Sequence, residues 1–214
     1  MRASKKAVED EKRTKPGLKL LENQLKDAER KKIKKERIAN ELVLELIWQY
    51  LAVLKVENAE ALYKKYKTYF NLKHNEKSLT IIGELYRKTS RFEEALDRFF
   101  KVQEMQEKTG NKASLRDTFY YIGTTYYDKG EPDKSLEYLL KSKELYEQGV
   151  ETERLGLLLM EIGMVYLIKG FLDRYIEYLM KARVVFEKIG KQPAVDIINL
   201  SIKDAKLIKS PSRR

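Results

Sequence analysis

The stretch Ile82-Gly83-Glu84-Leu85-Tyr86 decides the fold, because its pattern, Ile-Gly-x-x-Tyr, occurs three times in the chain. The pattern returns at Ile122–Tyr126 and at Ile162–Tyr166, and the step between successive glycines is 40 residues each time. Repetition at a fixed period of this size indicates a stacked array of similar units. A catalytic site needs one constellation of unlike residues, so the repeated motif favours a structural joint.

The composition favours helices. The chain has 214 residues, of which 43% are hydrophobic and 36% are charged, with only 10 glycines and 4 prolines. These values are typical of long solvated helices rather than of a loop-rich β fold. Since a second helical stretch follows each motif, the predicted fold class is all-α, an α-solenoid of antiparallel helix pairs.

Glycines and one proline mark the ends of the predicted helices. A glycine just past a helix end adopts the left-handed conformation without Cβ strain, and Pro132 suits the first turn of the helix that follows. The pair Ala61-Leu62 stands 34 residues before Ala95-Leu96 and suggests a divergent first unit. We therefore predict an array over residues 41–192, with units at about 41–75, 76–111, 112–150 and 151–190.

The repeated residues resemble the tetratricopeptide repeat family, in a longer form of about 40 residues per unit. In that family a small residue of the first helix lies opposite a small residue of the second helix, and an aromatic residue fills the space beside them. The matching small residues here are Gly83, Gly123 and Gly163, with Ala95 and Ser135, and the matching aromatics are Tyr86, Tyr126 and Tyr166. The resemblance implies a right-handed superhelix that binds other proteins.

One position departs from the family pattern. Tyr175 stands where the earlier units have Ala95 and Ser135, and its ring is too large for the same close contact. We therefore expect the last helix pair to be splayed, or its second helix rotated, and the last unit to act as a terminal cap.

The N-terminal region carries much of the formal net charge of +11. Residues 1–40 hold 14 Lys or Arg and 7 Asp or Glu, whereas residues 41–202 hold equal numbers of both signs. Residues 1–16 have few apolar side chains and are predicted to be a flexible arm. A helical stripe then begins at Leu18 and continues through Leu21, Leu25 and Ala28.

A basic run follows this stripe, and two interpretations of it stay open. It is either a solvated, charged helical spacer or a patch that docks on an anionic partner. The residues of the run are Lys31, Lys32, Lys34, Lys35 and Arg37.

The C-terminal region predicts one more helix. Pro193 can start it, and apolar residues recur at spacings of three and four: Val195, Ile198, Ile202 and Ala205. We predict a capping helix over residues 193–209 that covers the end of the array. Residues 210–214 are predicted to be a loose tail.

The resemblance also implies a concave groove lined by the first helices of successive units. The groove positions lie six and three residues before the motif glycine and one, four and five after it. The predicted partner-binding residues are Tyr120, Thr124, Tyr127, Met160, Met164, Leu167 and Ile168. The helix around Gly163 is apolar nearly all round, so it must be covered. The cover is the C-terminal helix, a second copy of the chain or a partner protein.

The sequence offers little for chemistry. There is no cysteine, and the one histidine, His74, lies in a polar turn. A glycine-rich phosphate loop is missing as well, so we predict no catalytic, cofactor or metal site and no enzyme activity. No apolar stretch reaches the roughly 18 to 20 residues of a membrane span, which predicts no membrane insertion and a cytoplasmic protein.

Two functions therefore compete. The first is an interaction scaffold that holds a peptide or an amphipathic helix of a partner protein in the groove, with self-association through the last unit as a variant. The alternative is a nucleic-acid- or ribosome-associated protein that contacts an anionic partner through its basic ends. No aromatic side chain is interleaved with the basic run and no base-reading module is present, so the scaffold ranks first.

Overall fold

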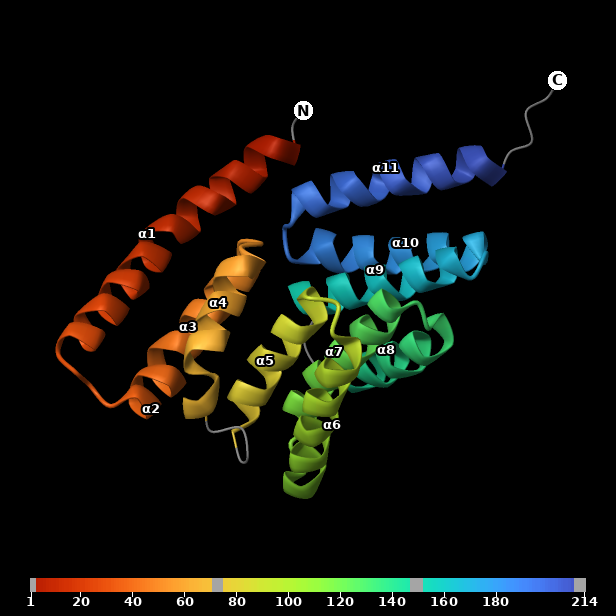
Figure 1. Ribbon diagram of the computed structural model, residues 1–214. Helices are drawn as coiled ribbons and strands as arrows, with labels where there is room; N and C mark the ends of the chain where they lie inside the picture. The colour runs from red at the N-terminus through yellow and green to blue at the C-terminus, as the bar shows by residue number, and fades with distance from the viewer. Residues whose placement is uncertain (1–2, 71–74, 147–151, 210–214) are drawn as a thin grey trace. The chain divides into compact units, whose positions relative to one another are not determined.

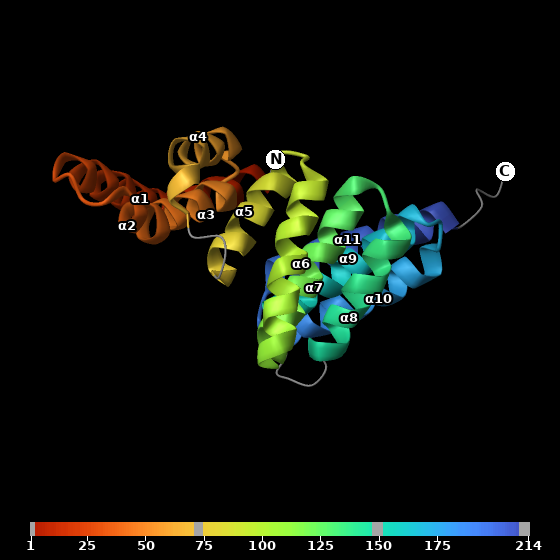
Figure 2. The same ribbon diagram turned by 60° about the horizontal axis from the view of Figure 1, so that its bottom comes forward.

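A computed structural model describes residues 3–70, 75–146 and 152–209, with side chains from Gly17 to Ile208 outside these gaps. Over the described residues the chain consists of helices, turns and short connections, with no strand, which confirms the predicted all-α class. The chain divides into two compact units, residues 1–102 and 103–214, and the boundary falls inside one helix. Figures 1 and 2 show the helices of each unit.

The first unit is built from short helices and one long one. Its helices are α1 (Ala3–Arg30), α2 (Lys35–Ile38), α3 (Leu44–Ala52), α4 (Val56–Tyr66), α5 (Glu76–Lys88) and the start of α6 (Phe92–Thr109). A π-helical turn, Ala39–Val43, joins α2 to α3, and a 3-10 turn, Lys67–Tyr69, follows α4. Helix α3 packs against both α4 and α5.

The first helix pair closes without a glycine. Ala59 of α4 is fully buried, and Tyr63 and Tyr66, one and two turns later, are buried as well. This spacing is the one that Ala95, Phe99 and Val102 follow on α6. Ala61, in contrast, is exposed. The predicted alignment of Ala61 with Ala95 is therefore wrong by two residues.

The corrected register places Ile47 of α3 at the glycine position and Tyr50 at the tyrosine position. Ile47 is fully buried and Tyr50 is nearly so. The sequence prediction missed this because the branched side chain at Ile47 gives no sign of a close helix contact. The first unit thus uses a bulky apolar residue where the later units use glycine.

The ends of the first helices support this register. Four equivalent residues adopt the left-handed conformation: Leu54 (φ 59°), Ser90 (φ 59°), Gly130 (φ 83°) and Gly170 (φ 81°). The next N–H then donates to the carbonyl of the motif tyrosine, at 2.8 Å from Lys55 to Tyr50 and at 2.8 Å from Arg91 to Tyr86. The same helix-ending bond therefore recurs at the same place in the repeat.

Helix α1 packs against α3 and belongs to the core of the first unit. Of the predicted stripe, Leu18, Leu25 and Ala28 are buried and Leu21 is half-buried. The helix begins at Ala3, ahead of the predicted start at Leu18.

Two carboxylates hold α1 in place. The Tyr50 hydroxyl donates to Glu22 at 2.6 Å. Glu29 accepts a hydrogen bond from the Tyr66 hydroxyl and pairs with Lys65 at 2.7 Å. Both acids lie on α1 and their partners lie on α3 and α4, so the contacts tie α1 to the first helix pair.

The second unit follows the repeat more closely. It contains the rest of α6, α7 (Lys112–Lys129), α8 (Pro132–Tyr146), α9 (Glu153–Ile168), α10 (Leu172–Lys188) and α11 (Gln192–Lys209). Helices α7 and α8 form one antiparallel pair and α9 and α10 the next, while α8 also packs against α9 and α11 against α10. The Thr118 hydroxyl of α7 donates to the Gln106 side chain of α6 at 2.8 Å.

Two motif glycines allow helices to come very close. A Cβ atom added at Gly123 would lie 2.7 Å from two side-chain carbons of Leu139 and 3.1 Å from its backbone nitrogen. At Gly83 an added Cβ would lie 2.6 Å from the ring of Phe99. Real Cβ atoms do not approach their neighbours this closely, so these contacts need glycine.

The third motif glycine lies in a looser joint. An added Cβ at Gly163 would meet Tyr175 and Tyr178 at 3.4 to 3.5 Å, which is ordinary packing. The bulk of Tyr175 predicts this difference. The pair is not splayed along its whole length, however, because a Cβ at Gly156 would lie 2.6 Å from the ring of Phe186. The close approach has moved from the middle of α9 to its start.

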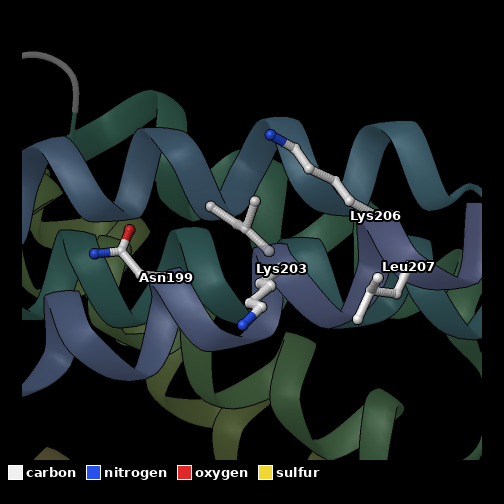
Figure 3. A pocket seen from close by; sticks show the side chains of 5 residues that line it. Asn199, Lys203, Lys206 and Leu207 are labelled. Carbon is white, nitrogen blue, oxygen red and sulfur yellow. The ribbon is translucent and has the colours of Figure 1, made fainter.

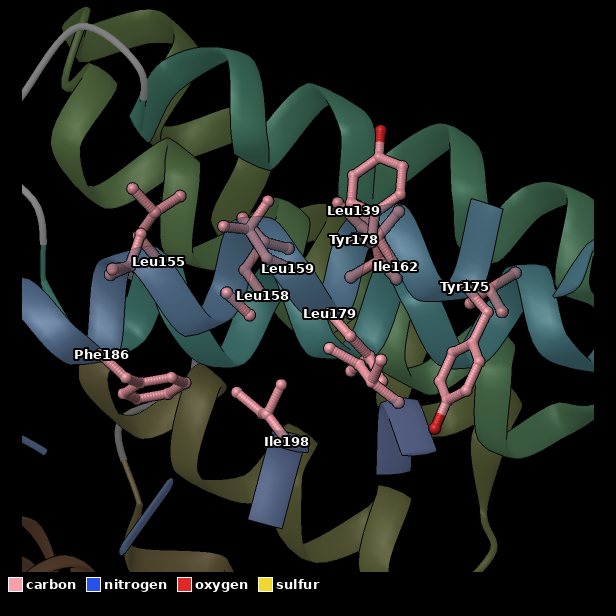
Figure 4. Close-up of a cluster of buried hydrophobic side chains, with 14 of the residues drawn as sticks. Leu139, Leu155, Leu158, Leu159, Ile162, Tyr175, Tyr178, Leu179, Phe186 and Ile198 are labelled. Carbon is pink, nitrogen blue, oxygen red and sulfur yellow. The ribbon is translucent and has the colours of Figure 1, made fainter. Parts of the chain in front are cut away.

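Helix α11 completes the core of the second unit. Its predicted stripe is buried throughout: Val195, Ile198, Ile202 and Ala205. These side chains join a cluster that also includes Ile162 of α9 and Leu179 and Phe186 of α10 (Figure 4). Since α11 packs against α10, it leaves Leu157 and Ile168 on the groove face of α9 exposed.

Candidate partner-binding surface

The predicted groove face of α9 combines buried and exposed apolar side chains. Met160, Met164 and Leu167 are half-buried and pack against the core cluster of the second unit. Leu157 and Ile168, at the two ends of the same face, are 44% and 58% exposed. The middle of this face therefore serves the core, and its two ends can contact a partner.

Helix α7 supplies the tyrosines of the predicted groove. Tyr120 and Tyr127 are half-buried and pack against the same cluster. Thr124 is only 5% exposed, and its hydroxyl donates to the Tyr120 carbonyl at 3.0 Å. The two tyrosines thus present part of their rings, whereas Thr124 offers little surface to a partner.

The electrostatics around Tyr127 favour its neutral form. Burial raises the pKa of its phenol, and the negative charges of Glu161 and Asp128 raise the pKa further. A phenol that keeps its proton can donate a hydrogen bond to a partner. Tyr127 can therefore act as an amphipathic contact at the edge of the apolar face.

A polar contact fixes the helices beneath this surface. Asp117 of α7 accepts a hydrogen bond from the Tyr146 hydroxyl of α8 at 2.9 Å and pairs with Arg154 of α9 at 3.2 Å. Burial and the charge of Asp117 raise the pKa of Tyr146 to about 12. Asp117 occupies a groove position in the repeat, but its structural role is to join three helices.

The structure reveals a second apolar face that the sequence prediction missed. Adding the 40-residue step to the five groove positions of α9 leads to Ile197, Leu200, Asp204, Leu207 and Ile208 on α11, so four of the five positions are apolar. All four side chains of α11 are more than half exposed. The repeat period of 40 residues could have located them. The sequence prediction considered only the buried stripe of this helix, because it assigned the helix a capping role.

The groove positions of α5 differ from those of α9 and α11. Glu84 and Arg87 form a two-point pair, with a contact of 2.8 Å, and both side chains are largely buried. Lys77 lies 3.5 Å from Glu45. These three side chains are charged, and their charges are matched within the first unit.

The predicted basic patch is not a continuous helical surface. Helix α1 ends at Arg30 and the chain resumes helix only at Lys35, so the predicted helical spacer is interrupted. Lys31 pairs with Asp27 at 2.7 Å, Arg37 pairs with Glu41 at 3.2 Å, and Lys35 lies over the Tyr69 ring at 5.4 Å.

The other two cations of the patch, Lys32 and Lys34, are exposed in the connection between α1 and α2. Three of the five cations are thus engaged within the chain. The patch receives no support as a nucleic-acid site from this geometry.

The described residues can be compared with the predicted absence of a metal site. Among the described residues no group of three or more His, Asp and Glu side chains is placed to hold a metal ion. His74 lies outside the described residues. Within the described part of the chain, no helix is both long enough and apolar enough to cross a membrane.

Paired helices, repeated joints and a row of exposed side chains on the first helices define a helical-repeat scaffold. Residues 76–148 match the family model of the tetratricopeptide repeat. The resemblance drawn from the motifs is confirmed over these residues. The fold supports protein-protein interaction in general. No curated protein matches the chain.

Solved structures of the same fold cover most of the chain. A putative kinesin light chain of Podosopora anserina, with nearly identical TPR-like repeats, has 18% identity and a TM-score of 0.62, covering 85% of this chain and 91% of that one. MamA has 22% identity and a TM-score of 0.57, covering 85% and 96%. BtubC (BKLC) from P. vanneervenii has 12% identity and a TM-score of 0.59, covering 94% and 95%. At these identities the likeness establishes the fold alone.

Proposed function

We propose that this protein is a non-catalytic scaffold of the cytoplasm that binds a peptide or an amphipathic helix of a partner protein. The binding surface is the row of exposed apolar side chains on α9 and α11, with Tyr120 and Tyr127 of α7 at its edge. The observation that carries the proposal is the shared register of Leu157 and Ile168 with Ile197 and Ile208.

The burial of the groove side chains supports this choice of anchors. Large exposed apolar patches are unusual on monomers and mark interaction surfaces. Met160 and Met164 lie between the exposed anchors and can adjust their shape to a ligand. Leu157 and Ile168 can be changed without emptying the core, whereas Met164 and Leu167 cannot, because they pack against the buried cluster.

The test compares a variant of the proposed surface with a control variant on α10. Leu157→Glu/Ile168→Glu alters the proposed surface, and Met180→Glu alters α10, where Met180 is 46% exposed against 44% for Leu157. Partners crosslinked and purified from source cells with the wild-type chain should be lost with the first variant and kept with the second. A purified partner should bind the first variant about 100-fold more weakly, since two anchor contacts are removed. Equal recovery with all three proteins would contradict the proposal.

A second copy of the chain is the competing occupant of the same surface. Light scattering over a concentration series distinguishes the two, because self-association makes the measured mass rise with concentration. We expect a monomer at concentrations where the partner binds. A wild-type dimer that Leu157→Glu/Ile168→Glu converts to a monomer would show that the surface serves self-association instead.

A further inference from the structure

The exposed apolar face of α11 carries one charged residue, Asp204. It occupies the groove position one residue after the motif glycine, since the step of 40 residues carries Met164 of α9 onto it. Leu200 lies one turn before Asp204 and Ile208 lies one turn after it, on the same side of the helix. All three side chains are exposed. Asp204 forms no ion pair with any side chain that the structure describes, so a carboxylate stands in the middle of the proposed partner surface.

Two further carboxylates border this surface on the other first helices. Asp128 of α7 is exposed at the groove position next to Tyr127, and Glu161 of α9 is half-buried one turn after Leu157. Besides burial, the negative charges of Glu161 and Asp128 raise the pKa of the Tyr127 phenol, so both charges act on this part of the surface. The row of anchors therefore carries negative charge on α7, α9 and α11.

Four cations at or near the ends of these helices form ion pairs within the chain. The pairs are Arg154 with Asp117, Lys191 with Glu153, Lys129 with Glu131 and Lys169 with Asp133. Because the two charges of each pair offset each other, these cations do not neutralise the carboxylate of Asp204.

The lysines of α11 lie on a different side of the helix from Asp204. A step of 40 residues carries Gly163 and Tyr166 onto Lys203 and Lys206, so both lysines occupy motif positions rather than groove positions. They line a hollow in which Asp204 takes no part (Figure 3). Among the five groove positions of α11, Asp204 is the charged one.

We propose that the partner segment bound by the surface of α9 and α11 is basic, with Lys or Arg among its apolar residues. This inference rests on the proposed function and names the chemistry of the partner. A partner that covers Leu200 and Ile208 removes Asp204 from water, which is unfavourable unless a cation pairs with the carboxylate. A second copy of the chain fits poorly, because a two-fold interface would bring this acidic face against itself.

The probe is a synthetic amphipathic helix of about five turns, with leucines on one side and lysines along both edges of that side. A second peptide has Glu in place of each Lys. The full-length chain carries a formal net charge of +11, so general electrostatic attraction would favour the Glu peptide. Fluorescence anisotropy should nevertheless show about tenfold tighter binding of the Lys peptide, and added salt should reduce this preference.

Neutral variants of the chain test where the preference arises. Asp128→Asn/Asp204→Asn should remove most of the preference for the Lys peptide. Asp97→Asn/Asp133→Asn makes the same change in net charge on α6 and α8, where the two side chains are 50% and 85% exposed, and should leave the preference intact. Equal affinities of the two peptides, tighter binding of the Glu peptide, or the same loss in both variants would overturn the proposal.

A third variant separates this inference from the proposed function. Leu157→Gln/Ile168→Gln removes two anchors without a change in charge and should weaken the binding of both peptides. If it does so while the wild-type chain binds both peptides equally, the surface is a binding site and only the basic character of its partner is refuted. Failure of both peptides to bind, or binding that this variant does not weaken, would contradict the surface itself and the basic partner with it.

Discussion

The joints at Gly123 and Gly163 share one sequence motif but pack differently. At Gly123 the second helix lies so close that an added Cβ would be 2.7 Å from Leu139, whereas at Gly163 the nearest atoms would be 3.4 Å away. The difference comes from the second helix, where Ser135 of the tight pair is replaced by Tyr175. A repeated motif on one helix therefore does not fix the packing, because the facing residue decides how close the helices come.

Gly123→Ala should have the largest effect on stability. The new methyl group would press on the Leu139 side chain and also on its backbone nitrogen at 3.1 Å, which cannot move away by a simple rotamer change. Overpacking costs about 1 to 3 kcal/mol, and the better helix propensity of alanine offsets up to about 1 kcal/mol. We expect the free energy of unfolding to fall by about 1 to 2 kcal/mol, measured by urea denaturation. An unchanged or higher midpoint would show that the joint can relax.

Gly163→Ala should act in the opposite direction. The contacts of its methyl group with Tyr175 and Tyr178 would be ordinary ones, so the gain in helix propensity of about 1 kcal/mol is kept in large part. Both glycines lie in the second unit, so the same unfolding transition reports on both variants. A loss of stability comparable to that of Gly123→Ala would mean that the two joints are equally tight.

The first helix pair, whose joint is at Ile47, extends the comparison to Leu54, the residue just past the end of α3. Leu54 holds the left-handed conformation (φ 59°) that Gly130 and Gly170 hold in the other pairs. Its side chain is 78% exposed, so little packing is lost on replacement. Leu54→Gly should raise the free energy of unfolding of the first unit by about 0.5 to 1 kcal/mol, since the Cβ strain is removed. The check is thermal unfolding, and a lower midpoint would contradict this assignment.

The sequence was sufficient where a periodic pattern reflects burial. The three glycine joints and the stripes through Leu25 and Ile198 lie where the spacing predicts, because helical periodicity follows the core directly. The first joint was misplaced by two residues, because Ile47 and Ala59 look like any other apolar residues of a helix. The tight contact at Gly156 was also missed, since it lies outside the motif and depends on where Phe186 arrives in space.

The candidate surface could also be predicted only in part from the sequence. Position in the repeat correctly indicates which residues of α9 share a face, but it cannot tell an exposed Ile168 from a half-buried Met164. That distinction depends on how closely α7 and α8 approach α9. The sequence prediction missed the exposed apolar residues of α11. The amphipathic pattern of this helix was interpreted as that of a capping helix with one buried side.

The contact of Glu29 with the first helix pair should make the smallest contribution to stability, and this contribution depends on pH. Hydrogen bonds from Lys65 and Tyr66 lower the pKa of the Glu29 carboxyl below its ordinary value of 4.5. A lowered pKa in the folded state means that the ionised form stabilises the fold above about pH 4.5, and that this contribution is lost as the pH falls further. Because the Glu29 side chain is 35% exposed, solvent screening limits the contribution to about 0.5 kcal/mol.

Glu29→Gln should therefore lower the stability of the first unit at pH 6 and have less effect at pH 3, where the wild-type carboxyl also becomes protonated. Hydrogen exchange of the α1 amides measures this directly, because α1 is the element that Glu29 attaches to α4. Exchange should be faster in the variant at pH 6, and the two proteins should converge at low pH after correction for intrinsic rates. A difference that is constant between pH 3 and pH 6 would assign the effect to lost packing instead of lost charge.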